Sequence, residues 1–167
     1  MAPRLFLLHG SDEFAIAEFV DKLKAKVADD PGTASLNITV LDGRSVTLSE
    51  VQSAAGAMPF LADIRLVIVE GWIARLTGKA EEGEISESSK AALASLIAYL
   101  PEVPDSACLA LVERRDVPER GPLFKALGQI PFAKVQKFDV PQGEALVEWI
   151  RKRVKQVKGE IAPAAAR

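Results

Sequence analysis

The sequence contains one cysteine and one histidine among 167 residues. A single cysteine cannot form an internal disulfide, which fits a protein of a reducing compartment. Cys108 lies in the apolar run 107–112 and is expected to be a buried, inert thiol. His9 has no second histidine or cysteine near it to complete a zinc site. No Gly-x-Ser-x-Gly motif accompanies it for a catalytic triad, so we expect a structural role for His9.

Long apolar runs and a strong net charge are also missing. No segment approaches the roughly 18 apolar residues of a membrane span, and the short apolar run after Arg4 does not resemble a signal peptide. The formal net charge of −2 gives no general attraction to nucleic acid or to anionic membranes. The apolar fraction of 49% and the charged fraction of 26% are those of a globular protein with a core.

The first predicted turn lacks the features of a phosphate-binding loop. Such a loop needs several glycines, a lysine for the phosphates and a Ser or Thr for magnesium. The turn at 10–14 has one glycine, no lysine and two carboxylates, Asp12 and Glu13. These carboxylates would repel a triphosphate where a helix N-terminus should attract it. We therefore expect neither nucleotide hydrolysis nor a bound cofactor.

Apolar runs of strand length alternate with segments of helical spacing along the whole chain. The strands are expected at 4–9, 36–41, 65–69, 107–112 and 133–138. Helices are expected near 16–27, 47–57, 93–100, 123–127 and 146–157, and a solvated loop or loose helix at 71–86. Thr47 and Glu50 have the spacing of a capping box. This alternation predicts an α/β fold with a mostly parallel five-stranded sheet and helices on both faces.

The segment 57–63 precedes the third strand and is irregular. Pro59 lacks an N–H and disfavours helical geometry at Met58, so the preceding helix should end near residue 57. Phe60 and Leu61 are then expected on a turn at the rim of the sheet. The residues alone leave two interpretations open: these side chains fold back onto the core, or they bind a partner.

Two further hypotheses concern charged residues. Asp12, Glu13 and Glu70 could meet at one sheet edge and hold magnesium, as in a phosphoreceiver or a phosphatase-like α/β domain. The alternative interpretation is a helix cap and a solvated strand end.

The last predicted helix is locally basic. Its positive residues form either a solvated face or a weak contact with the DNA backbone; they include Arg151, Lys152, Arg153 and Lys155. Trp72 and Trp149 are expected to be packing residues.

Several stretches resemble a known family when they are taken together. They are Leu5-Phe6-Leu7-Leu8-His9-Gly10-Ser11-Asp12-Glu13-Phe14, Ala57-Met58-Pro59-Phe60-Leu61-Ala62-Asp63 with the strand after it, 109–113, and Leu146-Val147-Glu148-Trp149-Ile150-Arg151. In this order they are similar to the delta subunit of the bacterial DNA polymerase III clamp loader.

This resemblance implies a degenerate AAA+ domain, like a P-loop NTPase fold without ATP binding. It implies that Met58, Pro59, Phe60 and Leu61 bind the sliding clamp (the beta subunit), with the apolar pair as a wedge. It also implies an accessory subunit without catalysis of its own in a DNA-directed DNA polymerase holoenzyme of the bacterial cytoplasm. The other loader subunits would be partners, and DNA would be contacted indirectly through the complex.

The resemblance also predicts the domain organisation. Residues 1–140 are expected to form the AAA+-like N-terminal domain, and residues 141–167 the final helix and the start of a helical lid. The family's collar domain is expected to be absent from this chain. The family usually has Leu before Phe in the wedge, whereas here Phe60 precedes Leu61, which conserves the apolar volume.

Overall fold

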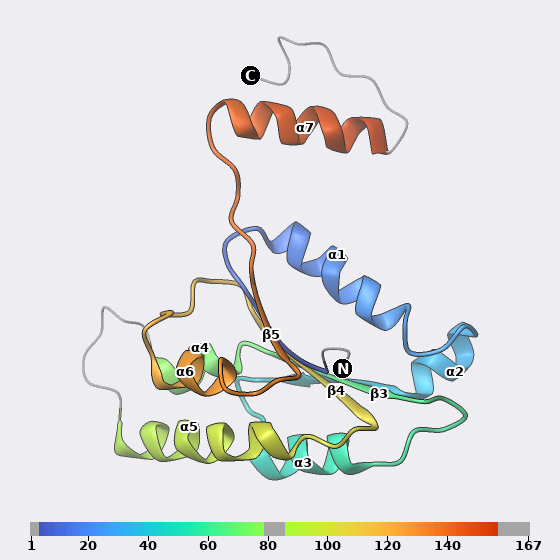
Figure 1. Cartoon of the computed structure of the whole chain (residues 1–167), viewed down its shortest axis with the longest axis vertical. Coiled ribbons are helices and arrows are strands. Elements are labelled where there is room, and N and C mark those ends of the chain that lie inside the picture. The colour runs from blue at the N-terminus through green and yellow to red at the C-terminus, as the bar shows by residue number, and fades with distance from the viewer. Residues whose placement is uncertain (1–3, 79–85, 157–167) are drawn as a thin grey trace.

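A five-stranded parallel sheet forms the centre of the computed structural model, which describes residues 4–78 and 86–156 (Figure 1). The strands are β1 (Leu5–His9), β2 (Ile38–Asp42), β3 (Arg65–Glu70), β4 (Ala107–Glu113) and β5 (Ala133–Lys137). Their spatial order is β2-β3-β4-β1-β5, and every neighbouring pair is parallel. The predicted α/β class and its parallel sheet are therefore confirmed.

The strand order explains which strands are wholly buried. All residues of β1 and β4 are buried, because these strands have a neighbour on each side and helices on both faces. The edge strands β2 and β5 are only partly buried, and they tolerate polar residues. The position of β5 at an edge accounts for its weak apolar pattern in the sequence.

Helices cover both faces of the sheet (Figure 1). On one face, α1 (Glu13–Lys24) packs against the sheet through residues such as Ile16 and Val20. The opposite face carries a larger cluster from α3 (Leu48–Gly56), α4 (Trp72–Thr77), α5 (Glu87–Tyr99) and α6 (Pro122–Leu127). A short 3₁₀ helix, η1 (Leu100–Glu102), follows α5.

Two predicted helix starts are present. Thr47 and Glu50 form a reciprocal capping box at the start of α3, in which each side chain accepts a hydrogen bond from the other's backbone N–H. The Asp12 side chain accepts from the backbone N–H of Ala15, 2.9 Å away, and caps α1.

The prediction for residues 30–41 was wrong in one respect. The segment begins with a short helix, α2 (Pro31–Leu36), and the strand starts only at Ile38. The Asp30 carboxylate accepts from the N–H of Thr33, and Pro31 occupies the first helical position, so this sequence starts a new helix, whereas α1 has already ended at Lys24. Leu36 is consequently a half-exposed helix residue and not part of the strand.

The prediction of a solvated segment after β3 was also wrong for residues 72–77. These residues form α4, in which Trp72, Ile73 and Leu76 are buried in the larger cluster. Trp72 is thus a packing residue, as predicted. The rest of that predicted segment, 79–85, lies outside the described residues.

The last helix, α7 (Glu144–Gln156), lies beyond α1 at one end of the molecule (Figure 1). Its Arg153 guanidinium forms an ion pair with Glu18 of α1 at 2.6 Å and lies 4.3 Å from the ring centroid of Phe14. The same guanidinium is 5.2 Å from the ring of Trp149, which is partly buried. The predicted end of this helix, near residue 157, lies outside the described residues.

Candidate functional site

The turn after β1 uses its amide groups within the chain. The N–H of Gly10 donates to the carbonyl of Arg115, and the N–H of Asp12 donates to the carbonyl of Phe138. Gly10 has a φ of +132°, and a Cβ at this position would overlap the Phe138 carbonyl. A phosphate loop must instead direct several free N–H groups at its ligand. This turn is therefore not built as a phosphate-binding loop.

The hypothesis of a magnesium site at Asp12, Glu13 and Glu70 is contradicted by the structure. Asp12 is buried and caps α1, while Glu13 and Glu70 both pair with Arg114, at 3.2 Å and 3.7 Å. The guanidinium therefore occupies the position between the two carboxylates that a cation would need. Within 4–78 and 86–156, no three His, Cys, Asp or Glu side chains are grouped as a metal site.

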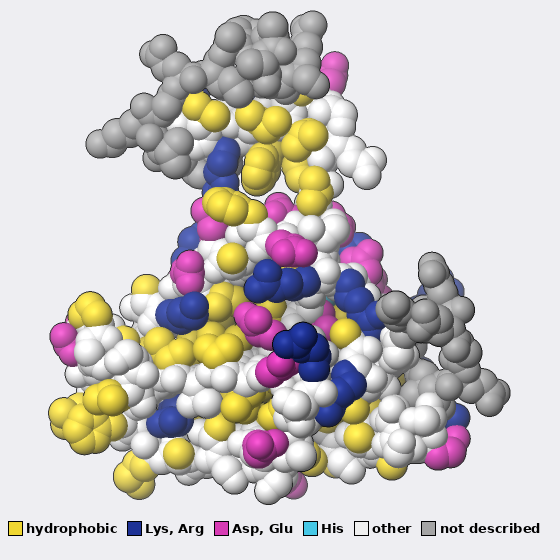
Figure 2. Space-filling view, turned by 180° about the vertical axis from the view of Figure 1, so that it is seen from behind, with side chains coloured by type: hydrophobic (Ala, Val, Ile, Leu, Met, Phe, Trp, Pro, Cys, Tyr) yellow, Lys and Arg dark blue, Asp and Glu magenta, His cyan; other side chains and the backbone are white. Residues whose placement is uncertain are grey.

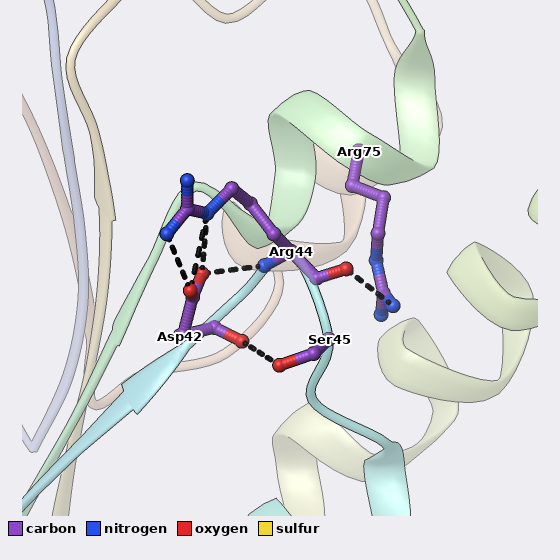
Figure 3. Close-up of polar contacts among 4 residues, drawn as sticks. All are labelled: Asp42, Arg44, Ser45 and Arg75. Atoms are coloured by element: carbon purple, nitrogen blue, oxygen red, sulfur yellow. Dashed lines mark hydrogen bonds and ion pairs between the residues drawn. The ribbon is translucent and has the colours of Figure 1, made fainter.

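A hollow of about 650 Å³ lies at the carboxyl ends of β2, β3 and β4, where parallel sheets often bind ligands. Its charged groups are engaged with one another. Arg44 forms a bidentate pair with Asp42 that holds the pKa of this carboxyl at about 2 (Figure 3). Arg114, another lining residue, lies 3.7 Å from the carboxylate of Glu70, and Arg75, outside the hollow, donates to the backbone carbonyl of Arg44. These contacts favour a structural role for the charges in this hollow.

The two residues with reactive side chains are buried. The Nδ1 of His9 accepts a hydrogen bond from the N–H of Val117, and the imidazole packs edge-on against Phe124. Burial lowers the pKa of His9 and raises the pKa of Cys108 to about 12. The prediction of an inert thiol at Cys108 fits this environment, and His9 has the predicted structural contacts.

The loop between α3 and β3 presents large apolar side chains to solvent. Met58 is 90% exposed, Phe60 55% and Leu61 80%. Of the two interpretations that the sequence left open, packing of Phe60 and Leu61 into the core is therefore excluded. We call Met58, Phe60 and Leu61 the apolar tip. Figure 2 shows hydrophobic side chains gathered at the far left, the end of the molecule at which this loop projects to the right in Figure 1.

Local backbone geometry fixes the apolar tip. The helix α3 ends at Gly56, and the next residue, Ala57, is extended, with φ −67° and ψ 136°. Pro59 follows and prevents helical continuation. Leu61 has a φ of +50°, in the left-handed region that non-glycine residues rarely occupy. Such strain persists only where neighbouring structure imposes the conformation.

The structural element that holds this loop was not predicted from the sequence. Asn37, fully buried between α2 and β2, donates to the carbonyl of Phe60 at 2.8 Å and accepts from its N–H at 2.7 Å. In the sequence, the only available signal was an asparagine inside the predicted strand 36–41, a position where this residue type is uncommon. A polar hollow of about 720 Å³ lies beside the loop, between Leu61, Asp63, Asp30 and Thr33.

The basic residues of α7 are in different environments. Arg153 is engaged with Glu18 and two aromatic rings, whereas Arg151 and Lys155 are exposed. The side chain of Lys152 lies outside the described residues. A contact with DNA by this helix stays a prediction. No helix in the described parts of the chain is long and apolar enough to cross a membrane.

Comparison with family models gives a match to "DNA polymerase III, delta subunit" over residues 6–135. The chain belongs to this family. The delta-family match includes β1 from Phe6 onward, the apolar tip and β4, which all contributed to the resemblance seen in the sequence. A search of curated proteins gave no match.

Solved structures share the fold of this delta-family chain. The Bacillus subtilis DNA clamp loader delta protein superimposes with a TM-score of 0.74 at 22% identity, covering 99% of this chain and 47% of that one. A gamma subunit-related protein of DNA polymerase III from Thermotoga maritima gives 0.54 at 16% identity, covering 93% and 48%. A chain of the HORMA:CdnC:Trip13 complex of Escherichia coli MS115-1 gives 0.55 at 14% identity, covering 99% and 57%. The chain thus spans about half the length of the B. subtilis protein.

Proposed function

We propose that this chain is the clamp-binding part of a clamp-loader delta subunit, and that the apolar tip inserts into an apolar pocket of the sliding clamp. The single observation that carries the proposal is the exposure of Met58, Phe60 and Leu61 on a fixed loop. Membership of the delta family supplies the class of partner. Pro59 shapes the loop between these side chains.

The energetics suit a small anchoring contact. Burial of a large apolar side chain stabilises a complex by about 1.5–3 kcal/mol relative to its exposed state. Phe60 and Leu61 have more than half of their surface available for burial. Two such anchors can dominate an interface, because a few residues usually carry most of the binding energy.

Opening of the clamp requires no chemistry from this chain. A protein that binds the open ring more tightly than the closed ring shifts the equilibrium toward the open form. In the turn after β1, backbone N–H groups donate to the carbonyls of Arg115 and Phe138, which fits a subunit without ATP hydrolysis of its own. We propose that the chain acts as an accessory subunit in the bacterial cytoplasm and depends on other loader subunits for contact with DNA.

Clamp binding by the double variant Phe60→Ala/Leu61→Ala tests the proposal. Immobilised beta clamp and surface plasmon resonance should show an affinity at least about a hundredfold lower, from the loss of two apolar anchors. Val140→Ala is the matched control, because Val140 is also an exposed apolar residue (46%) but follows β5, at the opposite edge of the sheet. Equal affinity of the double variant and the parent protein would contradict the proposal.

A further inference from the structure

We infer that Asn37 is a positioning residue for the apolar tip: it holds Phe60 and Leu61 in the conformation that inserts into the partner, without touching the partner itself. This inference rests on the proposed function and adds a residue outside the loop to the site. It is drawn from the hydrogen bonds, the burial and the backbone geometry around Phe60.

The Asn37 carboxamide is used at both of its ends. Its Oδ1 accepts from the N–H of Phe60 at 2.7 Å. Its Nδ2 donates to the carbonyl of Phe60 at 2.8 Å and to the carbonyl of Thr33 at 2.9 Å. The side chain is fully buried, so water does not compete for these groups. Both backbone polar groups of Phe60 are thereby fixed to one side chain.

This arrangement adds a side-chain link beside the pairing of β2 and β3. The backbone carbonyl of Asn37 already accepts from the N–H of Leu66, next to the first register pair of the two strands. The carboxamide of the same residue binds Phe60, in the loop five residues before β3 begins at Arg65. An asparagine can do this because its side chain is both a donor and an acceptor, whereas an aspartate would lose both donated bonds.

The contact also anchors the tip to α2. Asn37 is the C-terminal cap of this helix, and its Nδ2 bond to Thr33 orients the carboxamide. The next residue after Phe60, Leu61, has a left-handed φ of +50° that a free loop would rarely adopt. Asn37 on one side and the start of β3 at Arg65 on the other keep Leu61 in this conformation.

The expected benefit is pre-organisation. When only a fraction of the molecules has the binding conformation, the apparent affinity falls by that fraction. If loss of the carboxamide leaves about one molecule in ten with the tip correctly placed, the apparent Kd rises about tenfold. The contacts that the partner makes with Phe60 and Leu61 are unchanged in such a variant.

The test compares Asn37→Ala and Asn37→Ser with Thr39→Val for binding to the beta clamp by surface plasmon resonance. The Thr39 hydroxyl accepts from Arg65 at 3.0 Å and links the same two strands away from the tip, so Thr39→Val is the matched control. We expect about a tenfold loss of affinity for both Asn37 variants and an unchanged affinity for Thr39→Val. Unchanged affinity in the Asn37 variants, with circular dichroism like that of the parent, overturns the inference.

A double-mutant cycle separates positioning from a general loss of structure. Asn37→Ala is combined with Phe60→Ala/Leu61→Ala, and it should cause no further loss of affinity once the apolar tip is removed. A full additional tenfold loss in that background overturns the inference. If Phe60→Ala/Leu61→Ala binds the clamp with the affinity of the parent, the proposed function is wrong. If that variant loses affinity but the Asn37 variants bind like the parent, the proposed function stands and the inference about Asn37 is wrong.

Hydrogen exchange gives a readout that does not depend on the clamp. The Phe60 amide donates to Oδ1 of Asn37 in the parent protein and should therefore be protected from exchange. In Asn37→Ala and Asn37→Ser this amide should exchange faster, while the amides of β3 keep their protection. If the β3 amides of one variant also exchange faster, that variant has lost structure and the other variant is used for the comparison. Equal protection of the Phe60 amide in the parent and in both variants contradicts the inference.

Discussion

The carboxylate of Glu113 and the backbone N–H of Ile73 are joined by a 2.6 Å hydrogen bond in the interior of the protein. The second carboxylate oxygen accepts from the N–H of Ala74 at 3.1 Å. Glu113 ends β4 and is 1% exposed, so it caps the first turn of α4 from the neighbouring strand. Arg115 donates to Ala74 and Thr77 of the same helix. The position of α4 is therefore fixed by Glu113 and Arg115 in addition to the burial of its own Trp72, Ile73 and Leu76.

We predict that Glu113→Gln destabilises the protein by about 1–3 kcal/mol, the cost of a buried N–H that loses its partner. The glutamine amide can accept only one of the two hydrogen bonds from Ile73 and Ala74. Urea unfolding measures the change. Glu87→Gln is the control, because Glu87 lies on the surface of α5 and should change the free energy of unfolding little.

The single histidine should give a clear dependence of stability on pH. Burial, and to a smaller extent Lys137, lowers the pKa of His9 below the ordinary value of 6.5, against an opposing effect of Asp116. The unfolded chain then binds the proton more tightly, so stability is complete above pH 6.5 and falls as the pH drops toward the pKa of the folded state. Proton NMR of this imidazole should give a midpoint below 6.5, and His9→Gln should remove this part of the slope. A midpoint at or above 6.5 would show the burial argument to be wrong.

Cys108 should react slowly with thiol reagents in the folded protein. Burial raises its pKa to about 12, so at a given pH the folded protein contains about a thousandfold less thiolate than the unfolded chain. Labelling with a disulfide reagent, with and without urea, measures the ratio of the two rates. Comparable rates in the two states would contradict the buried position.

The capping box of α3 should contribute to stability but not to clamp binding. Thr47→Ala removes the hydroxyl that accepts from the N–H of Glu50 and should cost about 1 kcal/mol. Ser49→Ala, at an exposed position in the first turn of the same helix, serves as the control. Thermal unfolding gives the stability, and the affinity for the clamp should be the same for both variants, because α3 ends at Gly56 before the apolar tip.

The elements with a strong local signal were predictable from the sequence. The apolar runs of β1 and β4 reflect burial on both faces, and the capping box of Thr47 and Glu50 is a purely local interaction. The prediction that α3 ends before Pro59 was also local, because the proline ring removes the N–H that a continuing helix needs. The sequence did not predict whether Phe60 and Leu61 are exposed or packed into the core, because this depends on the distant segments that surround the loop.

The features that were missed depend on contacts between distant segments. The short helix α4 is stabilised by Glu113, about 40 residues further along the chain, and by burial of Trp72. Arg114, just after β4, pairs with Glu13 of α1 and Glu70 of β3, and its guanidinium takes the place of the predicted magnesium ion. Local sequence patterns do not predict such contacts between distant residues.

The closed turn after β1 limits what can be engineered into this protein. A lysine introduced at Ser11 would supply the positive charge that a nucleotide needs, but it would not release the amides already bonded to Arg115 and Phe138. The Phe138 carbonyl also fills the space next to Gly10. Conversion of the turn into an ATP site would therefore require the segment after β5 to be rebuilt as well. Substitution of side chains in the turn alone should leave the protein unable to bind and hydrolyse ATP.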